Sequence, residues 1–216
     1  MKCAQTNLAD AELFDPMGAA WSGVPAEAID LSATPLASQP SSFVRSYDPT
    51  KVGRVKQLEV QAVNNDATIF FRLSWQDEQK NLEVNENNQF PDGCGILMPL
   101  GGGDPPIQEM GAPGAPVNAW FWRADLGDQA RNVVAEGLGT TRATERSPLV
   151  ARSVYEDGVW HVVLARPLAV PGQSGEVAQL ARGTATRVGF AVWEGGNGER
   201  GGLKAFSREW RELDIS

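Results

Sequence analysis

The amino-acid sequence predicts an all-β protein, an antiparallel β sandwich with long loops and few short helices. Short apolar alternations with a period of two recur along the chain, and turn-forming residues separate them. The 23 glycines and 14 prolines favour many turns over long helices. Many short strands with turns at this spacing are typical of a sandwich. The length of 216 residues fits one large core, so we predict that residues 1–216 form a single domain.

The first predicted element is an antiparallel hairpin. Leu58, Val60 and Ala62 alternate with polar residues, which is typical of a half-buried strand. The turn-forming residues 64–66 follow it. Apolar residues alternate again over residues 69–75, so this segment is expected to be the partner strand.

The later strands are predicted from the same alternation, with one helix between them. Trp120 and Trp122 share a face, as do Cys94 and its alternate neighbours. Residues 175–182 look helical, with Ser174 as a candidate N-cap. The remaining predicted strands cover residues 94–98, 117–124, 131–136, 150–155, 159–165, 188–193 and 210–215.

Two glycine-rich loops stand out from this pattern. The segment 99–116 contains three consecutive glycines, four prolines beyond Pro99, and an exposed-looking methionine, Met110. The segment 194–206 reads EGGNGERGGLKAF and carries Lys204. Long loops in compact domains are usually functional or disordered, so both loops are candidate functional regions.

Composition excludes several functions. The net charge of −8 disfavours nucleic-acid binding, which needs a basic surface. No window approaches eighteen apolar residues, so no membrane span is expected. The first fourteen residues lack the apolar core of a signal peptide. Three interpretations stay open: the mature chain is shown, the protein stays in the cytoplasm, or a partner carries it out.

The two cysteines, Cys3 and Cys94, limit the redox chemistry of the chain. They can form one disulfide, although such a pair more often stays reduced when no secreted cysteine-rich pattern surrounds it. Two thiolates do not hold an iron–sulfur cluster. Neither cysteine lies in CxxCH, which excludes covalent c-type haem.

The sequence lacks the common catalytic motifs. His161 is the only histidine, and a lone strand histidine is usually structural or solvated. No GxSxG, phosphate-binding loop or EF-hand pattern is present, and no pair of carboxylates stands out as catalytic. The seven tryptophans are either core anchors or a sugar-stacking platform, and most are expected in the core.

Four stretches taken together carry a family resemblance. They are IFFRLSWQDE, PDGCGILMP with EMGAPGAPVNAWFWRADL, YEDGVWHVVLARPL, and VGFAVWEGGNGERGGLKAFSREW. In this order they resemble the haem b (gamma) subunit of the type II dimethyl sulfoxide reductase family. That group includes ethylbenzene dehydrogenase, dimethyl sulfide dehydrogenase, selenate reductase and chlorate reductase. The resemblance runs from about Trp21 to the C-terminus.

The resemblance implies a fold, a cofactor and two iron ligands. The family fold is an antiparallel β sandwich, in agreement with the strand pattern. The family's haem b iron is held by a methionine and a lysine, and the matching residues are Met110 and Lys204. A thioether favours ferrous iron, and a buried amine loses its proton readily beside a metal. His161 matches no family ligand position.

The resemblance further implies a non-catalytic electron-transfer subunit in a periplasmic complex. Its expected partners are an iron–sulfur beta subunit and a molybdenum alpha subunit of a heterotrimer, with cytochrome c as an external carrier. The alternative function is a carbohydrate-binding module on the same sandwich. An exposed tryptophan pair flanking a groove would favour sugar binding, whereas a Soret band would identify the haem protein.

Overall fold

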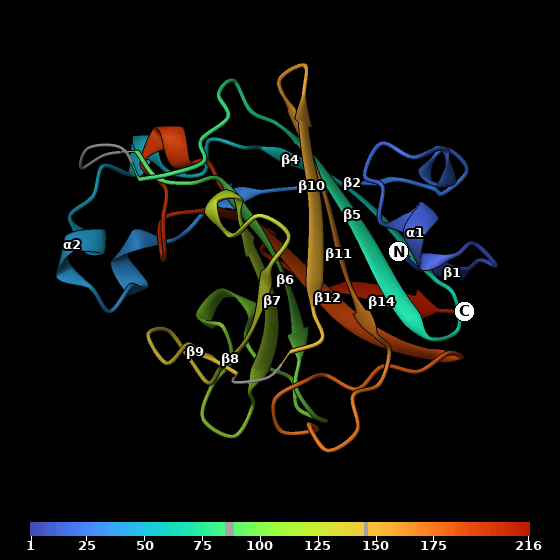
Figure 1. Ribbon diagram of the computed structural model, residues 1–216. Helices are drawn as coiled ribbons and strands as arrows, with labels where there is room; N and C mark the ends of the chain where they lie inside the picture. Colours follow the sequence, from blue (N-terminus) through green and yellow to red (C-terminus); the bar gives the residue numbers. More distant parts are fainter. Residues whose placement is uncertain (85–88, 145–146) are drawn as a thin grey trace.

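The fold is a two-layer β sandwich, as the sequence predicts, in a computed structural model that describes residues 1–84, 89–144 and 147–216. Hydrogen bonding runs continuously through the strands in the order β10-β11-β5-β4-β1-β14-β12-β6-β7-β8-β9. The strand β1 (Lys2–Gln5) pairs in parallel with both β4 and β14, and so joins the two layers. Figure 1 shows the layers, and the chain termini lie close together at one side.

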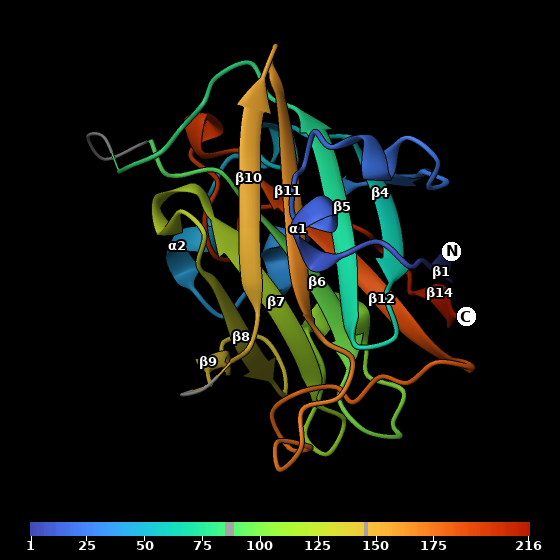
Figure 2. The same cartoon turned by 45° about the vertical axis from the view of Figure 1, so that its right-hand side comes forward.

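We call the layer that contains β5 the first sheet and the layer that contains β6 the second sheet. Figure 2 shows β10, β11 and β5 in front of β6 and β7. The first sheet consists of β10 (Val150–Glu156), β11 (Val159–Pro167), β5 (Thr68–Gln76), β4 (Gln57–Asn64) and β2 (Glu27–Asp30). The second sheet consists of β14 (Arg211–Ile215), β12 (Thr184–Trp193), β6 (Gly93–Pro99), β7 (Val117–Arg123), β8 (Ala130–Ala135), β9 (Arg142–Ala143), β13 (Ala205–Phe206) and β3 (Ser32–Ala33).

Helices in the described chain are few and short. Two of them are α-helical turns, α1 (Asp10–Leu13) and α2 (Ser42–Arg45). None of the described helices is long and apolar enough to cross a membrane. The 3₁₀ helices are η1 (Ala19–Trp21), η2 (Leu36–Ser38), η3 (Pro49–Lys51), η4 (Ile107–Glu109), η5 (Ala124–Leu126) and η6 (Gly195–Asn197).

Each strand predicted from alternation forms, with ends shifted by a few residues. The two predicted hairpins are β4–β5 and β10–β11, and both are antiparallel. The largest shift is in β12, which begins at Thr184 and not at Val188. Residues 184–187 of β12 lie outside its apolar part, and they belong to the strand because they pair with β14, beginning with Thr184 opposite Ile215.

The predicted helix over residues 175–182 is wrong, because buried polar side chains bind its backbone. The Ala178 N–H donates to Oδ1 of Asn118 at 3.1 Å, and the Ala178 carbonyl accepts from Arg166. The carbonyl of Glu176 accepts from Nδ2 of Asn118 at 3.3 Å. These tertiary bonds replace the bonds of a helix, and the segment instead forms turns and irregular structure.

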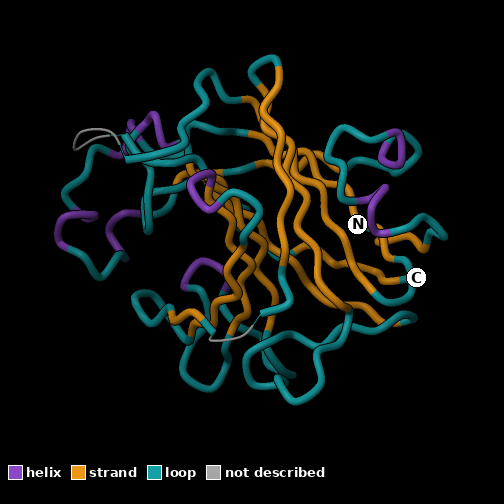
Figure 3. The backbone as a smooth tube through the Cα atoms, in the orientation of Figure 1, coloured by secondary structure: helices purple, strands orange, loops and turns teal. Residues whose placement is uncertain are grey.

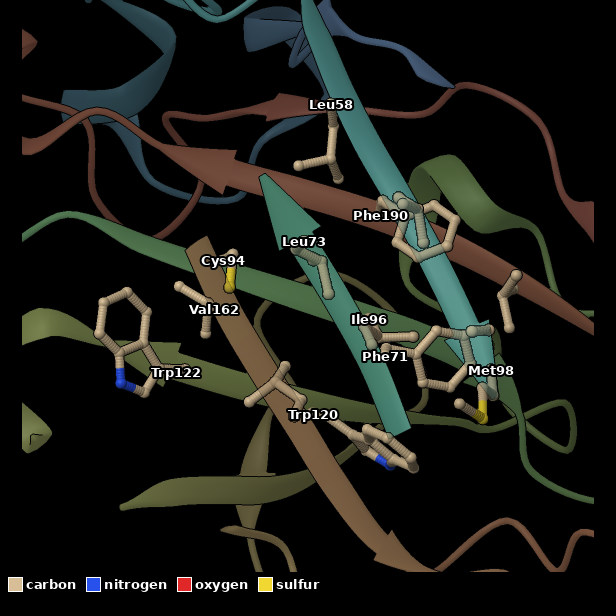
Figure 4. Close-up of a cluster of buried hydrophobic side chains, with 14 of the residues drawn as sticks. Leu58, Phe71, Leu73, Cys94, Ile96, Met98, Trp120, Trp122, Val162 and Phe190 are labelled. Carbon is tan, nitrogen blue, oxygen red and sulfur yellow. The ribbon is translucent and has the colours of Figure 1, made fainter. Parts of the chain in front are cut away.

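The main core lies between the two sheets, and Figure 4 shows part of it. Phe71 and Leu73 of β5 face Ile96 of β6 and Trp120 of β7 in this core. The rings of Phe71 and Trp120 meet edge to face at 5.7 Å between centroids. Five tryptophans are buried, which confirms that most of them are core anchors: Trp21, Trp75, Trp120, Trp122 and Trp160.

Both cysteines are free and buried, so the pair stays reduced in this structure. Cys3 lies in β1 and Cys94 in β6, and both pack in the main core. Burial raises the pKa of the Cys3 thiol to about 11 and also raises the pKa of Cys94. Both therefore act as small apolar side chains and not as reactive thiolates.

A buried carboxyl group makes stability depend on pH. Asp92 accepts hydrogen bonds from the N–H groups of Asn81 and Gly195 and from the indole of Trp160. Burial first, and the nearby Asp77 second, raise the pKa of Asp92 to about 7. Its folded pKa exceeds its unfolded pKa, so the folded state binds the proton more tightly. The stability that this proton contributes is therefore lost as pH rises through about 7.

We predict that wild-type stability contains a term that falls as pH rises from about 4 to about 7, by at most about 1.4 kcal/mol per pH unit. Urea unfolding across this range of pH, compared with Asp92→Asn, measures this term. The variant loses native hydrogen bonds and is less stable overall, so the slope against pH is the readout. Equal slopes in the two proteins would contradict the assignment.

Candidate functional site

A cavity of about 560 Å³ lies on the outer face of the second sheet. Strands β6, β7, β8 and β12 form its floor, and the glycine-rich loops around Met110 and Lys204 line it. Residues 39–41 and Val44, next to and within α2, line it as well. Figures 1 and 3 show α2 and its flanking loops beside the second sheet, on the side away from the chain termini. The volume is in the usual range for ligand sites.

The floor of the cavity mixes small residues with larger ones, among them Leu97, Phe121 and Trp193. Gly95 of β6 pairs with Ala191 of β12, and Ala119 of β7 pairs with Leu97. A β-carbon at Gly95 would lie 3.0 Å from the carbonyl oxygen of Trp120. Side chains at alternate positions of these strands point into the core, and the others face the cavity. The indole of Trp193 lies 3.5 Å from the same β-carbon position, so this ring covers Gly95.

Met110 is held in a strained backbone conformation at the cavity. It ends η4 with φ 56° and ψ 47°, the left-handed region that non-glycine residues rarely adopt. The Met110 N–H donates to the carbonyl of Ile107, and the Met110 carbonyl accepts from the N–H of Gly137 at 3.1 Å. Met110 is half-buried, so the expectation of an exposed side chain is wrong. Strain of this kind tends to occur at functional sites.

Lys204 enters the cavity from the end of the second glycine-rich loop. Its carbonyl accepts from both the N–H and the hydroxyl of Thr34, each at 3.0 Å, immediately before β13 begins. Its ammonium nitrogen lies 5.1 Å from the ring centroid of Trp193. Burial lowers the pKa of the Lys204 amine to about 8, so neutral amine is accessible near neutral pH.

The fold brings Met110 and Lys204 together, although 94 positions separate them in the sequence. The distance from Nζ of Lys204 to Sδ of Met110 is 3.6 Å. Trp193 supports the lysine, since its indole donates to the carbonyl of Gly201 and its ring meets Phe121 edge to face at 5.1 Å. A thioether and a weakly basic amine thus lie side by side in a largely apolar cavity.

This donor pair suits a metal carried by a cofactor better than a bare ion. Bare divalent ions in proteins are usually held by several histidine, cysteine or carboxylate groups. Within the described ranges, no group of three or more such residues has the geometry to hold a metal ion. A Met–Lys pair supplies two ligands, and the other ligands must come from the occupant.

His161 lies away from this cavity. It belongs to β11 in the first sheet, where Nδ1 is 2.9 Å from the Ser74 hydroxyl and 3.0 Å from Nη2 of Arg72. Burial first, and the charge of Arg72 second, lower the pKa of His161. These contacts agree with the structural interpretation of the lone histidine.

If haem binds at the Met110–Lys204 cavity, as the resemblance implies, we predict that His161→Ala leaves this binding unchanged, because the histidine does not line the cavity. The absorbance spectrum of the haem-loaded variant, beside wild type, measures this. Loss of low-spin features in the variant would mean that histidine is an iron ligand, and that Met110 or Lys204 is not.

The exposed tryptophan pair that a sugar platform requires is not found among the described lining residues. Trp120 and Trp193 line the cavity, but Trp120 is fully buried and belongs to the core. Trp210 is partly buried elsewhere, where its indole donates to the carbonyl of Pro105 at 3.0 Å. The arrangement therefore gives no support to stacking of a sugar between two tryptophans.

Several cavity residues were missed in the sequence. The glycines and alanines of the floor occupy the alternate positions of strands whose other positions were assigned to the core, and that alternation was the available signal. Nothing in the sequence predicted that residues 39–41 and Val44 line the cavity, because their position depends on how this segment folds back over the sheet.

Comparisons with known proteins agree on one family. The sequence matches the ethylbenzene dehydrogenase family over residues 19–147 and 138–205. It is 32% identical to the chlorate reductase subunit gamma of Ideonella dechloratans, over 96% of this chain and 82% of that protein. It is 32% identical to a putative respiratory nitrate reductase heme subunit of Haloferax mediterranei, over 94% of this chain and 68% of that protein.

A third relative and one solved structure extend this picture. The dimethylsulfide dehydrogenase subunit gamma of Rhodovulum sulfidophilum is 29% identical, over 91% of this chain and 73% of that protein. A putative carbohydrate-binding protein from Bacteroides uniformis has a TM-score of 0.54 at 8% identity, over 100% of this chain and 98% of that chain. At this identity the structural likeness concerns the fold alone.

Proposed function

Because the chain belongs to the ethylbenzene dehydrogenase family, we propose that it is an electron-transfer subunit that binds one haem b noncovalently between Met110 and Lys204. The chain is a subunit and not a catalyst, since its relatives are named as gamma or heme subunits of reductases and a dehydrogenase. In this proposal residues 1–216 form one haem-binding domain. When bound, haem supplies a one-electron iron couple.

The observation that carries the proposal is the approach of Met110 and Lys204 inside one cavity, 3.6 Å apart. A lysine coordinates a metal only as the neutral amine, and burial already lowers its pKa to about 8. The thioether of Met110 would favour the ferrous state of a bound iron and so raise its reduction potential. In this proposal, two residues from separate loops would hold the iron.

The remaining residues fit a macrocycle. Apolar and aromatic side chains such as Phe121 line the cavity beside the small residue Ala191, so a flat conjugated ring would have apolar surface to pack against. The carbonyl of Lys204 is fixed by Thr34, and Trp193 packs beside its amine. Such supporting contacts hold a ligand in position and keep bulk water from it.

The proposed partners follow from the family. We propose docking on an iron–sulfur beta subunit, which connects to a molybdenum alpha subunit, with cytochrome c as an external carrier. Two relatives are named as gamma subunits, which agrees with assembly into a larger complex. The proline-rich segment 99–116 carries Met110 and is a candidate contact near the iron. We propose a periplasmic location, reached as a mature chain or together with a partner.

An absorbance spectrum of the full chain loaded with haem b tests the cofactor. We expect a Soret band and low-spin features that persist through a reductive titration, and no affinity for cello-oligosaccharides. Sugar affinity without haem affinity would favour the carbohydrate-binding function. Co-expression with the candidate beta subunit, followed by size-exclusion chromatography, tests the partner. Separate elution at micromolar concentration would contradict the proposed complex.

A further inference from the structure

The charged residues that line the cavity are unusual for this acidic chain. The protein as a whole has a net charge of −8, yet among the residues that the structure describes, four of the five charged lining residues are cationic. Positive charge gathered at a largely apolar cavity favours an anionic occupant, because the field there is felt in low dielectric. The five residues are Arg123, Arg131, Glu199, Arg200 and Lys204.

Two of these residues already have strong partners within the chain. Arg123 pairs with the carboxylate of Asp125 through two hydrogen bonds of 2.6 Å. The carboxylate of Glu199 is buried and accepts from the N–H groups of Gly53, Arg54 and Glu194. Arg123 is therefore neutralised by an ion pair within the chain, and the carboxyl group of Glu199 already has its own hydrogen-bond donors.

Arg200 is held in place with part of its guanidinium still available. Its Nη1 donates to the carbonyl of Gly198 at 2.7 Å. The guanidinium lies over the ring of Phe90 at 4.1 Å and over the ring of Phe43 at 5.1 Å. These contacts fix the group without neutralising it, and no carboxylate of the described residues pairs with it.

Arg131 is the second lining arginine that has no carboxylate partner among the described residues. It lies on β8 directly opposite Phe121 of β7, and it is exposed at the cavity. Among the residues that the structure describes, it makes no ion pair or side-chain hydrogen bond. A guanidinium offers several donors in one plane, which matches a carboxylate.

We propose that Arg131 and Arg200 bind the two propionate groups of haem b and so anchor the acidic edge of the cofactor. This inference rests on the proposed function, and it deepens it by naming the residues that recognise the carboxylates. A neutral sugar would leave both charges without a partner. The cation-rich lining therefore also distinguishes an acidic macrocycle from a carbohydrate.

The dimethyl ester of haem b tests this directly, because it keeps the iron and the ring but has no carboxylates. Soret titrations of the full chain measure the affinity for each form. We expect wild type to bind haem b at least about tenfold more tightly than the ester. Arg131→Gln and Arg200→Gln should each weaken haem b binding by about five- to tenfold, and change binding of the ester by less than about twofold.

Two further variants and a spectrum separate this role from a structural one. Arg200→Lys keeps the charge but loses the paired geometry, so its affinity for haem b should lie between wild type and Arg200→Gln. Arg182→Gln is the matched control, because Arg182 pairs with Asp66 and does not line the cavity. The low-spin spectrum should be unchanged in each variant, since the axial residues are intact.

The outcomes distinguish the two proposals. If the glutamine variants weaken both forms equally, or neither, the arginines do not recognise the propionates and this inference fails while haem binding stands. If wild type binds neither haem b nor its ester, the proposed function fails and this inference falls with it.

Discussion

Replacing Lys204 by alanine is expected to remove one of the two proposed iron ligands and to weaken haem binding by at least about a hundredfold. The amine is the polar group that reaches Met110, at 3.6 Å, and the shorter side chain leaves that position empty. Met110→Ala should have an effect of the same kind, because it removes the thioether on the other side of the same pair. Either variant that still binds haem should lose its low-spin features.

The sandwich should stay folded in both variants. Lys204 and Met110 lie in loops on the outer face of the second sheet, outside the main core, so truncating them opens no core cavity. Circular dichroism checks the fold, and the absorbance spectrum reports the ligands. Lys51→Ala is the control, since Lys51 is exposed and does not line the cavity. Unchanged haem spectra in both Lys204→Ala and Met110→Ala would refute the ligand assignment.

Replacing Ala191 by phenylalanine is expected to exclude the cofactor while leaving the ligands in place. Ala191 lies in the middle of the cavity floor, paired with Gly95 on one side and Phe206 on the other. A phenyl ring added here has no room in the sheet and must occupy the cavity. We expect haem affinity to fall by about a hundredfold or more, because an occupied cavity cannot close on the ring system.

The same substitution elsewhere in β12 is the matched control. Ala185 lies in the same strand, where it is exposed and pairs with Asp214, away from the cavity. Ala185→Phe should bind haem as wild type does, and Ala191→Ser should retain most of the affinity. If Ala191→Phe still binds haem normally, the occupant does not lie on this floor, and the assignment of the cavity is wrong.

Local patterns were sufficient to predict the strands. Apolar residues alternate with polar ones in residues 57–62 and 69–75. Successive side chains of a pleated strand point to opposite faces, so this alternation places the apolar side chains on the face toward the core. Turn residues then fix where each hairpin reverses. The failed helix over residues 175–182 shows the limit of this argument, because the side chains of Asn118 and Arg166 bind its backbone from distant strands.

The candidate ligands were named from the sequence only through the family resemblance. Nothing in the residue pattern distinguishes Lys204 from a solvated lysine, and the glycine-rich loops alone indicate only that function is plausible there. Nothing in the residue pattern predicted that cationic residues line the cavity. Arg131 and Arg200 are ordinary surface residues until the fold brings them to one cavity.

Local apolar periodicity was enough to predict the all-β class, the two hairpins and the core positions of Trp120 and Trp122, because this periodicity acts over a few residues. The site, in contrast, depends on the tertiary fold. Pairing of β12 with β6, and of β6 with β7, assembles the floor. Loops that are distant along the chain then close over it and bring Met110 to Lys204. Contacts at such separations depend on packing across the whole sandwich, which no local pattern encodes.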